Sequence, residues 1–129
     1  MACELEPQHV GHDRLRFALM SGGLRMWNTR EQPDGFPDAR DGLVEFCVTE
    51  LLPHLERDER WLLQAQSCPE GGLLAEAMRA ETRTMTAAVY ELSTTTGPCE
   101  AMALTRVLHT FLAAHDHHES LLRATAATA

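Results

Sequence analysis

The sequence predicts an all-α protein folded as an up-down-up-down antiparallel four-helix bundle. Apolar residues recur at three- and four-residue steps through four long segments, and no alternating run of β-branched residues indicates a strand. Short connections between long helices favour antiparallel neighbours. The chain has 129 residues, 44% of them hydrophobic, which is enough for one domain with a core, so we expect a single domain over 1–129.

The first two helices are expected over residues 8–28 and 41–66. Between them, the stretch TREQPDGFPDARDG is rich in Pro, Gly and Asp and predicts the longest loop. Pro53 lies inside the second helix and cannot donate a hydrogen bond to the carbonyl of Thr49. This helix should therefore be kinked near 50–53 or begin anew at Pro53. Its apolar face comprises Val44, Cys47, Leu51, Trp61 and Ala65, and that of the first helix Leu15, Leu19 and Met26.

The third and fourth helices have clear start signals. Ser67 and Glu70 have the spacing of a capping box, and Pro98 suits the first turn of a helix. The apolar face of the third helix is Leu74, Met78, Met85, Val89 and Leu92, and that of the fourth is Ala101, Leu104, Leu108, Leu112 and Leu122.

Charge and composition exclude several classes of partner. The net charge is −8 and no basic cluster carries interleaved aromatic residues, which disfavours nucleic acid and anionic membrane surfaces. The N-terminus lacks a basic start and an apolar run, and no stretch approaches the ~20 apolar residues of a membrane helix, so we expect a cytoplasmic protein. The four cysteines show no C-x-x-C spacing, which disfavours a zinc ribbon and indicates reduced thiols.

Five metal-capable side chains lie on the apolar faces of three different helices. His115 and Glu119 are four residues apart, as are His54 and Asp58, and each pair continues the apolar face of its helix. His12 does the same on the first helix. One such pair alone is explained by a hydrogen bond, but burying all five without partners would be expensive, and a bound cation removes that cost. His117 should face solvent, and Asp116, Glu56 and Glu59 are assigned to a solvated face.

The segments GHDRLR, HLERDE and HDHHE, in this order on the first, second and fourth helices, resemble the hemerythrin-like HHE cation-binding family. The resemblance implies a hemerythrin-like bundle. It also implies a non-heme di-iron centre bridged by two carboxylates, with the ligands His12, His54, Asp58, His115 and Glu119. Asp58 stands where the family commonly has Glu, but an Asp can still bridge two metals.

The third helix departs from the family pattern. The family typically has Glu-His within a run similar to MRAETRTM, whereas this sequence has Glu81 followed by Thr82. Thr82 lies on the face of Met78 and Met85, so a hydroxyl is expected where the family has an imidazole. One metal of the pair is then lost, weakly held, or completed by water or by Glu81.

The leading functional hypothesis is a non-heme iron site, mono- or di-iron, that binds or senses a small ligand such as dioxygen, peroxide or nitric oxide. Manganese and zinc are the alternative metals, since nitrogen and oxygen ligands suit them too. One alternative is a non-heme iron oxidase, oxygenase or peroxide-consuming enzyme that uses the same open position. Another is a metal-free bundle that acts through interactions. The chain is expected to be a monomer or a homodimer, with Phe17 and Trp27 as apolar surface positions for a dimer.

Overall fold

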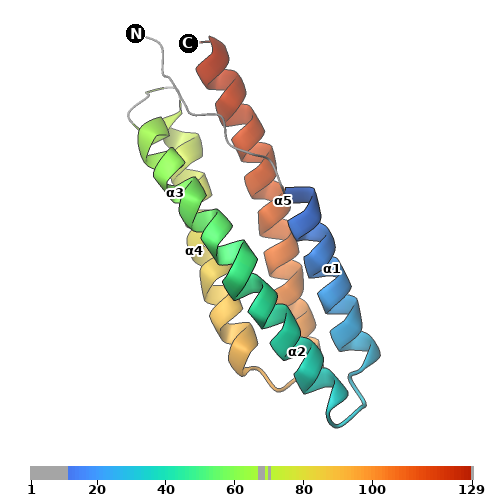
Figure 1. The fold of residues 1–129 in the computed structure, drawn as a ribbon. Helices are drawn as coiled ribbons and strands as arrows, with labels where there is room; N and C mark the ends of the chain where they lie inside the picture. The colour runs from blue at the N-terminus through green and yellow to red at the C-terminus, as the bar shows by residue number, and fades with distance from the viewer. Residues whose placement is uncertain (1–11, 67–68, 70, 129) are drawn as a thin grey trace.

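The computed structural model describes residues 12–66, 69 and 71–128, and all regular secondary structure in these ranges is helical. This confirms the predicted all-α class. The elements are α1 (His12–Asn28), α2 (Gly35–Phe46), the π-helical turn η1 (Cys47–Leu51), α3 (Leu52–Gln66), α4 (Gly72–Thr94) and α5 (Pro98–Thr128). Because α2, η1 and α3 follow one another without a break, they form one long rod, and Figure 1 shows it beside the other three helices.

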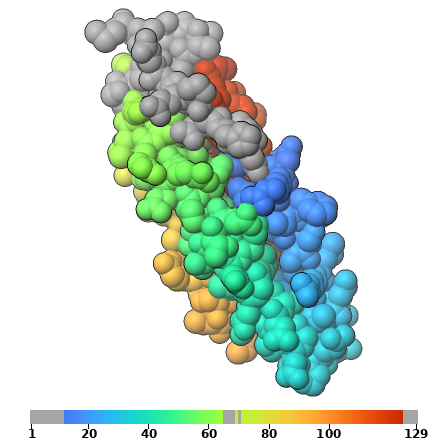
Figure 2. Space-filling view, in the orientation of Figure 1, coloured from blue at the N-terminus to red at the C-terminus, as the bar shows by residue number. Residues whose placement is uncertain are grey.

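The α2–α3 rod and the helices α1, α4 and α5 each have two main neighbours. The α2–α3 rod contacts α1 on one side and α4 on the other, and α5 contacts both α1 and α4. Figure 2 shows the rod as a continuous band of side chains next to α1. Within the described ranges, no helix combines the length and apolar character that crossing a membrane requires.

The second helix begins earlier than the sequence predicts. Helix α2 starts at Gly35, so the prediction of a loop over 29–42 is correct only for its first part. Pro37 is compatible with this start because the first turn of a helix has no intrahelical partner for its N–H groups. Phe36, Ala39 and Leu43 are buried, and this packing stabilises a segment whose composition indicates a loop.

The expected irregularity before Pro53 takes the form of the π turn. The Leu52 N–H bonds to the Cys47 carbonyl, five residues earlier, and α3 continues past Pro53 to Gln66. A π turn inserts about one extra residue into a helix. The chain therefore accommodates a proline without ending the helix or starting a new one.

The π turn also explains an unusual spacing of buried residues. Five of them follow one another at steps of four along the rod: Ala39, Leu43, Cys47, Leu51 and Leu55. At about 100° per residue, four such steps would drift by about 160° around a regular α-helix. One extra residue in the π turn reduces this drift to about 60°, which keeps all five on one face.

The ends of the last two helices agree with the sequence where the structure describes them. Pro98 is the first residue of α5, as predicted. Helix α4 ends at Thr94, and the Thr95 hydroxyl donates to Glu100 in the first turn of α5 at 3.0 Å. The capping box of Ser67 and Glu70, residues 8–11 and the side chain of Ala65 lie outside the described residues.

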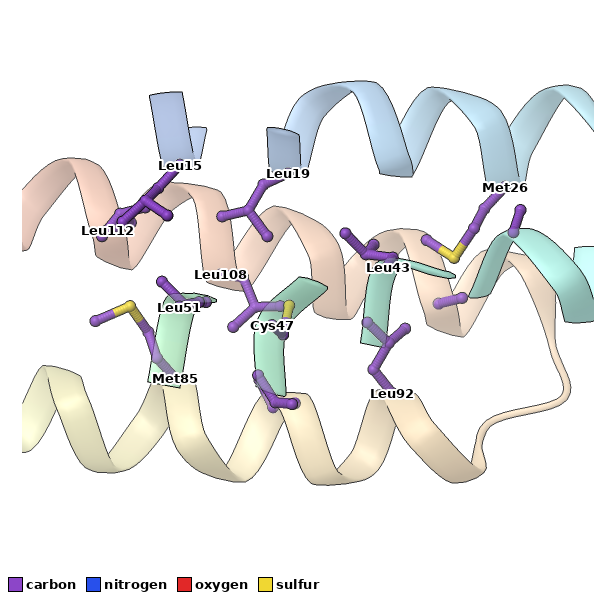
Figure 3. Close-up of a cluster of buried hydrophobic side chains, with 14 of the residues drawn as sticks. Leu15, Leu19, Met26, Leu43, Cys47, Leu51, Met85, Leu92, Leu108 and Leu112 are labelled. Carbon is purple, nitrogen blue, oxygen red and sulfur yellow. The ribbon is translucent and has the colours of Figure 1, made fainter. Parts of the chain in front are cut away.

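In the part of the chain that the structure describes, the buried core consists of two apolar clusters. The larger cluster runs along the bundle from Met26, Leu43 and Leu92 to Leu15 and Leu112 (Figure 3). The smaller one comprises Trp61, Leu62, Ala75, Met78 and Leu122. Along α3, α4 and α5, the residues between the two clusters include buried acids and a buried histidine: Asp58, Glu81, His115 and Glu119. A polar layer therefore interrupts the core.

Candidate metal centre

The polar layer brings all five predicted ligand residues together. His12 is the first residue of α1, His54 and Asp58 lie on α3, and His115 and Glu119 lie on α5. His12, Asp58, His115 and Glu119 are each at most 2% exposed, and His54 is partly buried. The four-residue spacing within α3 and within α5 places both members of each pair on the inner face, as the sequence predicts.

Asp58 is the centre of the arrangement. Its Oδ2 lies 3.2 Å from His115 Nε2, 3.5 Å from His54 Nε2 and 3.8 Å from His12 Nε2. The two facing nitrogens, His54 Nε2 and His12 Nε2, are 2.7 Å apart. Three imidazoles from three helices thus present the same ring nitrogen to one carboxylate oxygen.

These distances suit ligands of a common ion. Two atoms bound at about 2.1 Å to one metal lie about 3.0 Å apart at a right angle and about 3.4 Å apart at the tetrahedral angle. The separation of 2.7 Å between the His12 and His54 nitrogens and those of 3.2 to 3.8 Å from Asp58 Oδ2 to the three nitrogens bracket these values. The buried groups of this layer could therefore hold a metal ion, and the ligand atoms of His12, His54 and Asp58 form one set that lies within 4.8 Å of one another.

A second group lies at the other nitrogen of the same ring. His12 Nδ1 is 2.6 Å from Asp116 Oδ1 and 3.5 Å from Glu119 Oε2, and these three residues also meet the spacing of a metal site. Glu119 Oε1 pairs with Arg123 at 3.0 Å. Glu119 is therefore part of the layer, but it faces Nδ1 of His12, whereas Asp58 faces Nε2.

The position of Asp116 differs from the prediction, which assigned this residue to a solvated face. Its side chain is 21% exposed and its Oδ1 is hydrogen-bonded to His12. His12 reaches it across the contact between α1 and α5, a long-range pairing that spacing within α5 cannot reveal. His117, one residue further along, is exposed as predicted.

The contribution of α4 also differs from the expectation. Glu81, rather than Thr82, faces the cluster: its Oε1 lies 3.4 Å from His115 Nδ1 and its Oε2 lies 2.9 Å from His118 Nδ1. The Thr82 hydroxyl donates to the Met78 carbonyl. Its side chain lines a surface groove between α3 and α4, together with Leu55, Tyr90 and others. The expectation that position 82 faces the metal ligands is therefore wrong.

A Thr82→His substitution tests this register. Because position 82 lines the surface groove, the new imidazole is expected to leave the metal content of the purified protein unchanged. The unfolding free energy should change by about 1 kcal/mol or less, as at other positions away from the core. Elemental analysis and thermal unfolding measure the two quantities. A rise in bound metal in this variant would show that position 82 faces the cluster after all.

Electrostatics in the layer favour two added positive charges. Arg16 and Arg123 pair with Asp116 and Glu119, whereas among the described residues the ion-pair partners of Asp58 and Glu81 are histidines. With neutral imidazoles, the charges of Asp58 and Glu81 would be buried without a cation, which is costly. Two protons or one divalent ion would neutralise them.

The pKa values of His115 and His12 are raised by the negative charges of this layer. Burial lowers the pKa of His115, but the carboxylates of Asp58 and Glu81 outweigh burial and raise it to about 9. Burial also lowers the pKa of His12, but Asp58 and Asp116 outweigh burial and raise it above its ordinary value. Burial dominates at His54 and lowers its pKa.

The acids shift in the complementary direction. Burial alone would raise the pKa of Asp58, but His115 and His12 hold it well below its usual range. The pKa of Glu81 is lowered against the effect of burial by His115 and His118. Both acids are therefore ionised at neutral pH and available to a cation.

Comparisons with known proteins add no assignment. The chain matches no protein-family model, and comparisons with curated proteins and with solved structures return no significant match. The resemblance to the hemerythrin-like family accordingly rests on the three short motifs of the sequence.

Proposed function

We propose that the polar layer binds iron as a non-heme centre, with His12, His54 and His115 ligating through Nε2 and Asp58 through its carboxylate. The observation that carries the proposal is the convergence of the three Nε2 atoms on Asp58 Oδ2 within a buried layer. Imidazole and carboxylate ligands without thiolate suit iron, with manganese and zinc as competitors. The only described buried thiol, Cys47, lies in the larger apolar cluster, and burial raises its pKa to about 12.

The proposed biological role is to bind or sense a small ligand such as dioxygen, peroxide or nitric oxide. Four protein ligands leave coordination positions open on an ion that prefers six, so iron would supply a Lewis-acidic site for such a ligand. The protein's own residues supply negative charge, fixed ligand orientation and shielding from water. Asp58 neutralises charge and orients three imidazoles, and the apolar clusters on both sides of the layer limit the access of water.

The proposal includes the hemerythrin-like up-down-up-down arrangement that the sequence motifs imply. It is supported by the ring of contacts in which α1 and α4 each lie between α5 and the α2–α3 rod. It is also supported by the order of the ligands, with His12 on the first rod, His54 and Asp58 on the second and His115 on the last.

Metal analysis tests the proposal. Protein purified without a tag after iron-supplemented expression, or reconstituted anaerobically with Fe(II), should contain iron at fewer than two ions per chain. His54→Ala should lose most of it, since this imidazole is one of four ligands. His117→Ala, which removes an exposed histidine of α5, is the control and should keep the full content. Nitric oxide added to the Fe(II) protein should change its visible absorption.

Two results would count against the proposal. If neither wild-type preparation holds a transition metal, the bundle is metal-free and the interaction hypothesis takes its place. If His54→Ala and His117→Ala bind iron equally, the metal lies elsewhere on the chain.

A further inference from the structure

Two of the proposed ligand imidazoles have a carboxylate behind them. His12 and His115 are both fully buried and present Nε2 to Asp58. At their other nitrogen, His12 Nδ1 lies 2.6 Å from Asp116 Oδ1, and His115 Nδ1 lies 3.4 Å from Glu81 Oε1. Each carboxylate comes from a different helix than the imidazole that it faces.

An ionised carboxylate can only accept a hydrogen bond, so the His12 Nδ1 that bonds to Asp116 carries the proton, whereas His115 Nδ1 and Glu81 Oε1 form an ion-pair contact that a small shift would turn into the same bond. A neutral imidazole with its proton on Nδ1 has its lone pair on Nε2. Carboxylates in this position also fix the orientation of the ring and raise the basicity of the ligating nitrogen. Asp116 and Glu81 thus stand where they would direct Nε2 of both rings toward Asp58.

The two carboxylates are themselves held by basic groups. The second oxygen of Asp116 lies 3.6 Å from the Arg16 guanidinium, and the second oxygen of Glu81 lies 2.9 Å from His118 Nδ1. Arg16 and His118 are each 29% exposed, so they connect the buried layer to the surface. In both cases, one oxygen faces the anchoring group and the other faces the imidazole.

We infer that Asp116 and Glu81 are positioning residues that hold His12 and His115 for one metal ion bound at the Nε2 side, and that neither carboxylate is a ligand. This inference rests on the proposed function. It also decides between the two potential metal sets of the layer. A ring that ligates through Nε2 keeps its proton on Nδ1, so the set of His12 Nδ1, Asp116 and Glu119 holds no second ion.

The test uses Co(II) and Zn(II) as the probes and four variants of the full chain: Asp116→Asn, Asp116→Ala, Glu81→Gln and Glu81→Ala. Each is expected to lower metal affinity by about 10- to 100-fold, the usual effect of losing such a partner, while saturating at one ion per chain like the wild type. The amide variants should bind more tightly than the alanine variants, because an amide oxygen still accepts from Nδ1. The Co(II) absorption spectrum should shift in all four, and a purely structural role would leave it unchanged.

Glu76→Gln is the matched control, since Glu76 is an exposed acid on the same helix as Glu81. It should bind Co(II) with wild-type affinity and spectrum. Thermal unfolding of the metal-free variants separates loss of fold from loss of positioning, and the near-isosteric Asn and Gln variants supply the decisive comparison if an alanine variant unfolds.

The outcomes separate the inference from the proposed function. Two ions in the wild type and one in Asp116→Asn would make Asp116 a ligand, which overturns the inference and leaves metal binding intact. Variants with wild-type affinity and spectrum would also overturn it. A wild type that binds neither Co(II) nor Zn(II) would overturn the proposed function itself.

Discussion

Replacing Asp58 by asparagine is expected to lower metal affinity by roughly 100- to 1,000-fold. This factor corresponds to about a quarter of the ~10–16 kcal/mol with which four ligands bind a structural zinc ion. Asp58 Oδ2 lies within 4 Å of all three Nε2 nitrogens. The amide is close in size to the carboxylate, but it carries no charge and is a poor ligand. The effect should therefore exceed that of any single change at Asp116 or Glu81.

The matched control is Glu56→Gln, which neutralises an exposed acid on the same helix. It should bind metal like the wild type. The metal-free Asp58→Asn protein should also lose roughly 3 kcal/mol of unfolding free energy at neutral pH, because one partner of a buried ion pair is gone. Chelator competition and thermal unfolding measure the two effects. Wild-type affinity in Asp58→Asn would show that the imidazoles meet the metal elsewhere.

Metal affinity is expected to rise with pH between about 6.5 and about 9. In the metal-free protein, the pKa of His115 is about 9, so its ring is protonated over much of this range, and the pKa of His12 is raised as well. A ligating Nε2 must lose its proton, and each proton displaced changes affinity about tenfold per pH unit. Displacement of the His115 proton should therefore give a slope of about tenfold per unit that flattens above about pH 9, and the His12 proton adds to it. The ordinary histidine pKa of ~6.5 would place the change lower.

The stability of the metal-free protein should change in the opposite direction. A pKa raised from about 6.5 to about 9 at His115 contributes roughly 3 kcal/mol to folding, fully present below the unfolded value and lost as pH rises through about 9. Chelator competition corrected for protonation of the chelator gives the affinity, and thermal unfolding at each pH gives the stability. An affinity that is flat from pH 6.5 to 9 would rule out histidines with raised pKa values as ligands.

Much of the site was accessible from the sequence because helical spacing is a local property. The pairs His54–Asp58 and His115–Glu119 are four residues apart, and both lie on buried faces. His12 was predicted as a ligand because it continues the apolar face of α1. The start of α2 was missed because a Pro- and Gly-containing stretch has the composition of a loop, and only the packing of Phe36 reveals a helix there.

The supporting carboxylates show where spacing is insufficient. Between Met78 and Met85 on α4, a step of three then four selects Glu81, and a step of four then three selects Thr82, so the periodicity fits both positions. The buried Ala88 lies seven residues after Glu81, but the buried Ala75 lies seven residues before Thr82, so the two alanines favour one position each. Asp116 lies one residue from His115 and is recruited by a histidine more than 100 positions away, which no local rule can detect.

The π turn makes the second helix tolerant of the loss of a single residue at one place. It adjusts the rotation between α2, which packs in the larger apolar cluster, and α3, which carries His54 and Asp58. Deleting the exposed Val48 would remove the extra residue and make the bond from the Leu52 N–H to the Cys47 carbonyl an ordinary α-helical bond, so α2 and α3 would keep their relative rotation. Losing one residue elsewhere in the rod would instead rotate its two parts by about 100° relative to each other and separate His54 and Asp58 from the other ligands. In a lineage of such chains, this turn is therefore the place where the length of the second helix could vary by one residue without loss of the site.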